Sequence, residues 1–368
     1  MVLEELKLKN FRNYETLNIK LNPHINIIYG NNAQGKTNLL ESIYVLGITK
    51  SHLISIDNNL IKDGENKFKI TGTIKNNKLK KKLEVISNND KKILNIDNKE
   101  IKKVSDYINN SLNIIIFYPE DLEIIKGSPV NRRNYINIEL SQLSDNYLKI
   151  LNEYNKLLKI RNDYLKKLNK NENIDNTYFD IITNYLIDKA LLIYRMRKKF
   201  IDKINEACEN IFYNLTKIKG FYLKYLTNYI GEVDDLKQYM NDLYIKNRKK
   251  EIKIGTTLYG PHRDDLEFYI NDKNLKQYGS QGQKRIAILA TKLSEIEIFK
   301  KYKGTNPILL LDDVFSELDD IKRNNIIKYI DNDIQVIITT TELRKINKFK
   351  SVSIYKIKEG KIIKIKEV

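Results

Sequence analysis

Short apolar runs separated by polar turns dominate the first third of the chain, and this pattern predicts β-strands. Leu6, Leu8 and Phe11 alternate with polar residues, and similar alternating runs fill residues 68–101. An alternation of period two buries one face of each strand and leaves the other face to water. The sequence therefore predicts an antiparallel β-sheet with polar turns.

Apolar residues then recur three and four positions apart across residues 130–215, which predicts helices. One stripe runs through 140–168 and is broken only by Arg161, and a second stripe runs through 181–211. Two long antiparallel helices with a packed seam satisfy this spacing. Their aromatic residues fit a helix core better than a surface for stacking bases. Short strands are expected after them, at 220–225 and 252–259.

A third kind of segment is the short, fully apolar run that ends in residues with special chemistry. The run 25–29 leads into a glycine loop that matches the phosphate-loop pattern G-x-x-x-x-G-K-[ST] at every fixed position. A helix follows the loop, because apolar residues recur at helical spacing as far as Leu46. We assign the loop and the first helical turn to nucleotide binding: Gly30, Asn31, Asn32, Ala33, Gln34, Gly35, Lys36, Thr37 and Asn38.

The residue types of this loop suit a bound phosphate chain. Gly30 and Gly35 let the backbone curl so that successive N–H groups face phosphate oxygens, and the helix adds its positive end. Lys36 would reach the terminal phosphates, and Thr37 would place a hydroxyl on Mg²⁺. An ordinary glycine turn is the alternative, but the strand before the loop and the helix after it favour a phosphate loop.

Another apolar run, 308–311, ends in the paired acids Asp312 and Asp313. A carboxylate at the tip of a buried strand beside a phosphate loop is where Mg²⁺ needs a ligand, so Asp312 is the candidate metal ligand together with the loop threonine. Asp313 is the candidate for orienting the attacking water, and Glu120 is the next candidate. Two solvated acids in a turn are the alternative.

Two other helix starts carry candidate anion sites. Gly279 and Ser280 open a helix with free N–H donors, although a simple serine cap is the plainer explanation. Arg132 and Arg133 lie in the first turn of another helix, where their charges oppose the helix dipole. An anionic ligand or DNA would therefore explain the two arginines better than helix stability does.

Composition narrows the class of protein further. The 368 residues suffice for two domains, and no apolar run is long enough to cross a membrane. Charges interrupt the N-terminal segment at once, so we expect no signal peptide. Cys208 is the only cysteine, which excludes an internal disulfide and a cysteine-built zinc site and suits a reducing cytoplasm.

The formal net charge of +18 favours a polyanionic partner, most often nucleic acid. A plainer source exists, since Asn, Ile, Lys and Tyr are all abundant and AT-rich coding adds lysine everywhere. Two explanations are also open for the run of three lysines at Lys80, Lys81 and Lys82. A solvated strand edge that blocks aggregation explains them as easily as a contact with DNA does.

The order of these segments resembles that of the ABC-type ATPases in the SMC-like branch, and more closely the RecF family of recombination mediators. The resemblance implies an α/β fold with an ABC-type P-loop ATPase head, built of a mixed sheet and an antiparallel β-subdomain and formed by 1–126 and 256–368. Residues 127–255 would form an inserted α-helical arm domain. At the position of Asp313, ABC transporters carry a glutamate, and this difference argues against a transporter. The resemblance is carried by Lys9 to Tyr14, Gly30 to Thr37, Pro119 to Leu122, Gly260 to Leu266, Gly279 to Gln283 and Leu310 to Asp319.

The resemblance also implies partners and residue roles. Two protomers would close on two ATP molecules, and each ATP would meet Ser280 and Gly282 of the other protomer. Such proteins bind duplex DNA with ATP and, with RecR, direct RecA to gapped DNA. Lys36 and Asp313 would be catalytic. Arg12 would touch ATP, unless it is a structural arginine of the N-terminal hairpin.

Three other functions remain possible from the sequence. A transporter's nucleotide-binding subunit would need a membrane partner and no affinity for DNA, and both the charge and the inserted arm argue against it. A DNA tether of the SMC type would need far longer coiled coils than this arm allows. A switch that binds ATP with negligible hydrolysis is not excluded.

Overall fold

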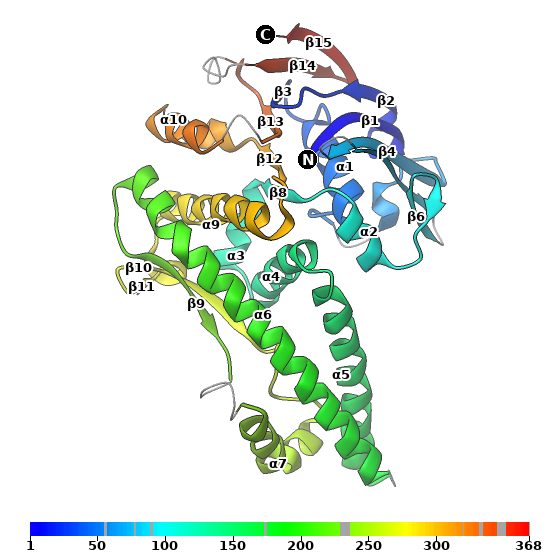
Figure 1. The fold of residues 1–368 in the computed structure, drawn as a ribbon, viewed down its shortest axis with the longest axis vertical. Coiled ribbons are helices and arrows are strands. Elements are labelled where there is room, and N and C mark those ends of the chain that lie inside the picture. Colours follow the sequence, from blue (N-terminus) through cyan, green and yellow to red (C-terminus); the bar gives the residue numbers. More distant parts are fainter. Residues whose placement is uncertain are drawn as a thin grey trace. The chain divides into compact units, whose positions relative to one another are not determined.

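The computed structural model describes residues 1–54, 57–76, 79–88, 91–172, 175–228, 236–318, 320–330, 334–343 and 351–367. Asp319, the last residue of the resembling segments, lies outside these ranges. The chain divides into two compact units (Figure 1). The head unit consists of Met1–Leu122, Ala207–Lys219 and Arg285–Val368, and the arm unit consists of Glu123–Glu206 and Gly220–Lys284. This division groups 256–284 with the arm unit, whereas the sequence-based boundaries assign that segment to the head.

A mixed sheet in the head unit is built from β3 (Ile25–Tyr29), β8 (Ile114–Phe117), β12 (Ile308–Asp312), β13 (Val336–Thr340), β14 (Val352–Lys358) and β15 (Lys361–Glu367). Its order is β15-β14-β3-β13-β12-β8, and only the β14–β15 pair is antiparallel. Strands β8, β12 and β13 are buried along their whole length, and β3 is buried along most of it. Burial on both faces explains why these segments read as continuous apolar runs.

An antiparallel sheet in the head unit is built from β1 (Val2–Phe11), β2 (Tyr14–Lys20), β4 (Lys67–Asn76), β5 (Leu79–Asn88), β6 (Lys92–Ile96) and β7 (Lys99–Glu100). Its order is β2-β1-β4-β5-β6-β7, which confirms the predicted sheet. Its apolar face packs on α1 (Lys36–Ile48), the helix after the glycine loop. A Cβ at Gly72 would lie 2.3 Å from Cδ2 of Leu46, so only glycine permits this close approach.

Shorter elements complete the head unit and support the predicted α/β class. Among the helices that the structure describes, none has the length and apolar character that crossing a membrane requires. Helix α9 (Gln281–Lys303) begins in the arm unit and continues in the head unit. The other elements of the head unit are η1 (Asp57–Leu60), α2 (Val104–Asn110), η2 (Pro119–Leu122), η3 (Val314–Glu317) and α10 (Asp320–Tyr329).

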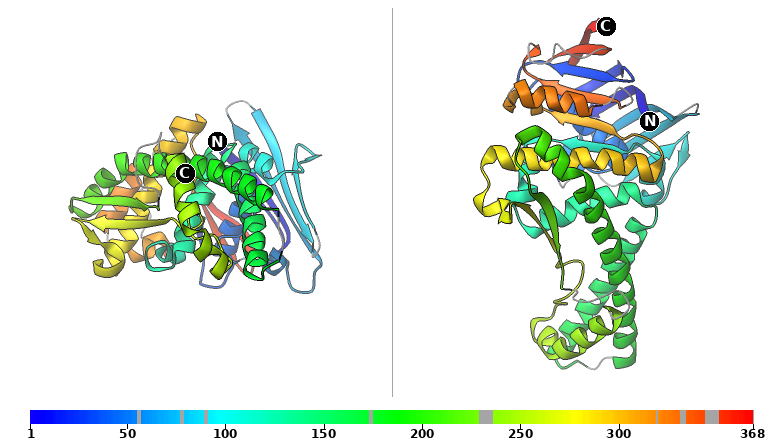
Figure 2. Two further views of the ribbon diagram at one scale, coloured as in Figure 1. Left: turned by 90° about the horizontal axis from the view of Figure 1, so that it is seen from below. Right: turned by 60° about the vertical axis from the view of Figure 1, so that its left-hand side comes forward.

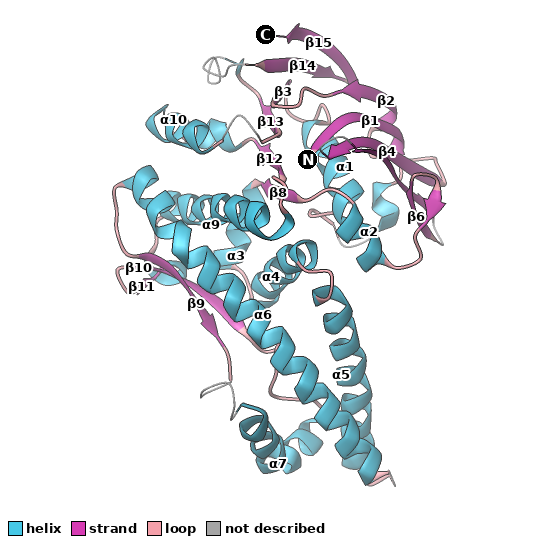
Figure 3. Cartoon of the chain, in the orientation of Figure 1, coloured by secondary structure: helices cyan, strands magenta, loops and turns pink. Residues whose placement is uncertain are grey.

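The arm unit is mainly helical (Figure 3). It contains α3 (Glu123–Lys126), α4 (Pro129–Leu143), α5 (Tyr147–Asn169), most of α6 (Asn176–Thr216), α7 (Leu236–Ile254), α8 (Leu275–Tyr278) and the strands β9 (Phe221–Leu226), β10 (Asp265–Ile270) and β11 (Lys273–Asn274). Helices α5 and α6 lie side by side, as Figure 2 shows, and this agrees with the predicted pair of long antiparallel helices. The first stripe, however, is divided between α4 and α5.

The strand expected at 252–259 is wrong, because α7 continues to Ile254. The helix ends at Gly255, whose left-handed φ of 75° suits a glycine after the last helical turn. The Gly255 N–H donates to the carbonyl of Glu251 at 2.7 Å. Strand β9 confirms the other short strand expected after the long helices.

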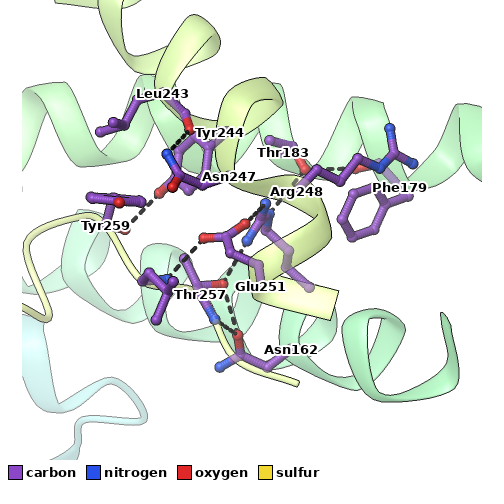
Figure 4. A network of polar contacts seen from close by, with 12 residues as sticks. Asn162, Phe179, Thr183, Leu243, Tyr244, Asn247, Arg248, Glu251, Thr257 and Tyr259 are labelled. Atoms are coloured by element: carbon purple, nitrogen blue, oxygen red, sulfur yellow. Dashed lines mark hydrogen bonds and ion pairs between the residues drawn. The ribbon is translucent and has the colours of Figure 1, made fainter. Parts of the chain in front are cut away.

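Arg161, the residue of α5 that breaks the first apolar stripe, is buried and contacts Thr183 of α6 and Glu251 of α7. Figure 4 shows the network of polar contacts that includes these two partners. The Arg161 guanidinium donates to Glu251 Oε2 at 2.6 Å and to Thr257 Oγ1 at 2.8 Å. A third bond reaches Thr183 Oγ1 at 3.1 Å, and the guanidinium carbon lies 4.5 Å from the centre of the Tyr244 ring. The interruption in the apolar pattern is therefore a buried polar junction of the arm unit.

A second network holds the loop before β10. Arg132 forms a two-point pair with Asp265, with Nε–Oδ1 at 2.5 Å and Nη2–Oδ2 at 3.0 Å. Arg133 donates to the carbonyl of Asp264 at 2.9 Å, and buried Arg197 lies 3.5 Å from the Asp264 carboxylate. Arg132 and Arg133 thus have partners inside the arm unit. The anionic ligand expected for them from the sequence is not needed to explain their charge.

We expect Arg161→Gln to destabilise the arm unit by roughly 3–5 kcal/mol, because Glu251 would keep a buried charge without its partner. The double variant Arg161→Met, Glu251→Leu should recover most of this loss, since it removes both charges. Hydrogen exchange of the α5 and α7 amides measures the effect. Lys198→Gln, which breaks the exposed pair with Asp202, is the control and should cost less than about 1 kcal/mol. A loss for Arg161→Gln no larger than the control's would contradict the prediction.

Candidate nucleotide-binding site

The glycine loop lies between β3 and α1, at the carboxyl end of the mixed sheet. Ala33 and Gly35 adopt left-handed backbone conformations, with φ of 64° and 105°, and these curl the loop. Such a turn directs neighbouring N–H groups towards its inside, where an anion can bind. A Cβ at Gly30 would lie 2.5 Å from the carbonyl oxygen of Ile357, so the loop has no room for a larger residue there.

Two turns hold the loop from outside. The buried Tyr14 hydroxyl, at the start of β2, donates to the carbonyl of Gly35 at 2.9 Å. Asn13 donates to the carbonyl of Gln34 at 3.4 Å. The backbone N–H of Glu359, between β14 and β15, donates to Gln34 Oε1 at 2.6 Å. The loop conformation therefore depends on hairpins from both ends of the chain.

Lys36 places its ammonium group at the glycine loop. Its Nζ donates to the carbonyl oxygens of Gly30 at 2.8 Å and Asn31 at 2.9 Å. Burial lowers the pKa of Lys36, while the nearby carboxylates of Asp313 and Asp312 act in the opposite direction. The ammonium group therefore lies at the loop whose bound phosphates the sequence analysis expects it to reach.

Thr37 meets Asp312 across the end of the sheet. The Thr37 hydroxyl donates to Asp312 Oδ2 at 2.8 Å, and the Thr339 hydroxyl donates to Asp312 Oδ1 at 2.5 Å. The N–H of Asp313, which has a left-handed φ of 52°, donates to the same Thr339 oxygen at 3.0 Å. Burial raises the pKa of Asp312, and the charges of Asp313 and Glu120 add to the rise. The acids predicted from the sequence therefore lie together, beside the loop threonine.

Arg12 forms a structural pair in the head unit. It turns the chain after β1 with a φ of 53°. Its guanidinium binds the buried Glu41 of α1 at two points, both 2.8 Å, and donates to the carbonyl of Asn59 at 3.0 Å. The next residue, Asn13, accepts a hydrogen bond from Asn38 at 2.9 Å. This geometry matches the hairpin-arginine alternative and orders the first turn of α1.

Ser280 and Gly282 belong to the arm unit. The N–H of Ser280 donates to Gln283 Oε1 at 2.9 Å, and the N–H of Gln283 donates to Ser280 Oγ at 3.2 Å. This reciprocal arrangement is a capping box. A Cβ at Gly282 would meet no atom of the described residues within 4 Å. Glycine weakens a helix by about 1 kcal/mol relative to alanine, so packing within the chain gives no reason for it.

The imidazole ring of His52, in the head unit, has an unusual environment. Its ring lies between those of Tyr44 and Tyr118, with centroid distances of 5.0 and 4.6 Å. Both ring nitrogens are shielded from water and have no hydrogen-bond partner in the described part of the chain. Burial, together with the charges of Lys292 and Arg12, lowers the pKa of His52 to about 3. The His52 ring is therefore uncharged at neutral pH.

Sequence reasoning missed three residues that hold the site, namely Tyr14, Glu41 and Thr339. A hydroxyl at the end of a buried run is a signal for Thr339, but its two partners are apparent only in the folded chain. Tyr14 stands in the segment that resembles the RecF family, and nothing local marks its bond to the loop. Glu41 is one polar residue in a helical pattern, so its pairing with Arg12 depends on tertiary structure.

We expect His52→Phe to remove part of the acid sensitivity of the head unit. Unfolded His52 binds a proton near pH 6.5, whereas the folded residue binds one only near pH 3, so stability falls as the pH drops through this window. Phenylalanine keeps the ring packing and has no proton to bind. Between about pH 7 and about pH 5, the variant should lose roughly 2 kcal/mol less than the wild type in thermal unfolding. Equal losses in the two proteins would contradict this origin of the acid sensitivity.

The chain matches a known protein family over nearly its whole length. Residues 2–364 match the family model described as RecF/RecN/SMC N terminal domain. The chain is 39% identical over 354 residues to the DNA replication and repair protein RecF of Latilactobacillus sakei, covering 95% of this chain and 94% of that protein. It is 40% identical over 370 residues to the protein of the same name from Clostridium botulinum (strain Loch Maree / Type A3), covering 99% and 100%.

Solved structures agree with the sequence relatives. The chain is similar to a structure described as the recombination mediator protein RecF-ATP in the RecFOR pathway, with a TM-score of 0.91, 32% identity, and coverage of 99% of this chain and 98% of that chain. A likeness to an Smc head domain from Pyrococcus furiosus, with a TM-score of 0.56 and 17% identity, shows a shared fold alone. The mixed sheet, the antiparallel β-subdomain and these matches confirm the ABC-type ATPase fold, and the chain belongs to the RecF family.

Proposed function

We propose that this protein binds DNA in an ATP-dependent manner during recombinational repair and replication restart, and that slow ATP hydrolysis releases it. The observation that carries the proposal is the 2.8 Å bond between Thr37 and Asp312, which are 275 positions apart in the chain. A phosphate loop whose threonine meets an acid at the tip of a neighbouring strand is the arrangement that binds a metal nucleotide in P-loop ATPases. In this proposal, 1–126 and 256–368 form the ATPase head and 127–255 the arm.

The residues present fit MgATP. The amides of Gly30 to Gly35 and the ammonium of Lys36 would hold the phosphates. The Thr37 hydroxyl and the Asp312 carboxylate are the hard oxygen donors that Mg²⁺ accepts, with water completing its shell. The ion would neutralise charge on the phosphates. It would also offset the burial of Asp312 and the charges of Asp313 and Glu120, which together raise the pKa of Asp312.

Asp313 is the proposed group that orients the attacking water. The end of β12 and the bond from its N–H to Thr339 fix the backbone of Asp313 next to the metal ligand. Glu120 is the alternative, since its charge acts on the same Asp312 carboxyl. A carboxylate that positions water acts through geometry, and its amide should therefore preserve nucleotide binding.

We propose further that Ser280 and Gly282 act on the ATP of a second protomer. The capping box places a helix N-terminus there, and the open space at Gly282 suits close approach by an atom from outside the chain. The chain would then have two anion-binding elements, the phosphate loop and the helix start at Ser280. Two-fold symmetry would bring the loop of one protomer and the helix start of the other to the same ATP. For Arg12 to touch ATP, its pair with Glu41 would have to open.

Duplex DNA near single-strand gaps is the proposed partner, and the net charge of +18 supports a polyanion. Related proteins are named DNA replication and repair proteins, and a similar structure is assigned to the RecFOR pathway. By this relation we propose RecR as a protein partner and RecA as the recombinase that the complex helps to load. The cytoplasm is the compartment where this DNA work would occur.

We expect Asp313→Asn to bind ATP normally and to accumulate as a long-lived ATP dimer, because Asp312 still holds the metal while the water loses its orientation. Hydrolysis should fall by at least about tenfold, and sedimentation should show a persistent dimer after ATP addition. Glu120→Gln is the matched control and should turn over nearly as fast as the wild type. If Asp313→Asn hydrolysed ATP normally and Glu120→Gln hydrolysed it slowly, Glu120 would be the residue that orients the water.

Mixing two inactive variants tests the shared sites. We expect Ser280→Arg to bind ATP as a monomer without hydrolysing it, and Lys36→Met to lose ATP binding. In a mixed dimer, one site joins the intact loop of the Ser280→Arg chain to the intact Ser280 of its partner. At equal mixing about half the dimers are mixed, so at most about a quarter of the sites are intact.

Partial recovery of ATPase activity on mixing is therefore the expected result. Cross-linking of mixed dimers must be measured in parallel, because the site with both lesions can weaken closure. Mixed dimers that form readily and remain inactive would show that the sites are not shared. Unchanged ATP affinity in Lys36→Met would instead overturn the assignment of the phosphate loop.

A further inference from the structure

We propose that the outer face of the antiparallel sheet in the head unit binds the phosphate backbone of duplex DNA. This inference rests on the proposed DNA-binding function and names a surface that carries it. The lysine face, as we define it, lies on β1, β4 and β5. It consists of Lys7, Lys9, Lys69, Lys75, Lys80 and Lys82.

The alternation along the strands places these lysines on one side of the sheet. On β1, Leu6 and Leu8 are buried while Lys7 and Lys9 are exposed. On β4 the buried Ile70 and Ile74 alternate in the same way with lysine and threonine positions. One open hollow of the sheet surface is lined in part by Lys7, Lys9, Lys69, Lys82, Thr71 and Thr73. Ammonium and hydroxyl groups thus share one concave area.

Cross-strand pairing does not explain why lysines face one another in this sheet. Lys9 lies directly opposite Lys69, and Lys75 lies directly opposite Lys80. Like charges facing each other across strands destabilise a sheet. Protection of an edge against aggregation does not explain Lys9 and Lys69 either, because each of these two residues is paired with a neighbouring strand on both sides. For Lys80 the edge explanation stays open, whereas the placement of Lys9 opposite Lys69 favours contact with a polyanion.

The acids on this surface hold lysines in place without cancelling their charge. Glu84 is 5% exposed and pairs with Lys69 at 2.9 Å and Lys82 at 3.0 Å. Burial alone would raise the pKa of Glu84, but hydrogen bonds from Lys69, Lys82 and Asn95 lower it to about 2. Glu84 is therefore a permanent anion that orders two ammonium groups.

The remaining charges leave the surface positive. Glu5 pairs with Lys7 at 3.2 Å, and Glu4 pairs with Lys80 at 2.6 Å. Six lysines against these three acids leave a net charge of +3. Lys9 forms no ion pair with any residue that the structure describes, and it faces Lys69, whose charge it repels. This cross-strand pair is therefore the most suitable point to test.

The spacing of the lysine face suits a DNA backbone. Neighbouring strands are about 4.8 Å apart, and side chains on one face recur about every 6.7 Å along a strand. Phosphates follow one another about every 3.4 Å along the axis of each DNA strand, within reach of flexible lysine stems. Lysine contacts to phosphate carry no base information, so this surface should bind duplexes of any sequence.

The experiment compares the full-length protein with Lys9→Gln, Lys69→Gln in binding a short duplex with MgATP over a range of salt concentrations. Each phosphate contact contributes about 0.9 to the slope of log affinity against log salt. The double variant should therefore lose about 2 from the slope and bind roughly tenfold more weakly at physiological salt. Its melting temperature should change little, because the substitution removes a repulsive cross-strand pair and Glu84 keeps its ion pair with Lys82 at 3.0 Å.

Lys102→Gln, Lys103→Gln is the matched control, since it removes the same charge from exposed positions of the head unit that lie outside β1, β4 and β5. The control should bind within about twofold of the wild type. A Lys9, Lys69 variant that matches the control would overturn the lysine face while leaving DNA binding by the wild type intact. Loss of the ATP dimer in that variant would overturn it too, by making the face an interface between protomers. No DNA binding by the wild type would instead overturn the proposed function itself.

Discussion

The parallel pairing of β13 between β3 and β12 is the constraint on which the head unit depends. Thr340 is in register with Tyr29 at the end of β3, and Thr339 is in register with Asp312 at the end of β12. Strands that run parallel end at the same edge of the sheet, so the glycine loop and the acids meet there. A slip of one residue would turn these side chains to the other face of the sheet. The contact between Thr37 and Asp312 follows from this register.

Thr339 shows how one hydroxyl supports several groups at this edge. It donates to the carboxylate of Asp312 and accepts from the N–H of Asp313. Hydrogen bonds offset part of the free-energy cost of burying the Asp312 carboxylate. Tyr14 and Glu359 support the loop on its other side, from hairpins far apart in the chain. The residues that hold the site are thus themselves fixed, because they are buried or belong to a strand or hairpin of a sheet.

Charges serve two different purposes in this chain. In the arm unit, Arg161 and Arg197 are buried, and each faces a carboxylate and further hydrogen-bond partners. Charges placed in that way order a junction, because removing either partner leaves an unsolvated ion. On the outer face of the antiparallel sheet, Lys9 and Lys69 are instead set opposite each other at some cost in stability. This placement supports the proposed contact of that face with a polyanion.

Local patterns in the sequence determined the phosphate loop, the acid-tipped strand, the alternating strands and most helices. Each depends on spacing within a few residues, as in the match at Gly30 to Thr37, so it can be predicted without tertiary structure. Only the tertiary structure decided that Arg12 pairs with Glu41 and that Lys9 lies opposite Lys69. It also decided where α7 ends and how the site is held by Thr339. These features depend on which distant segments pack together, and local spacing does not encode that choice.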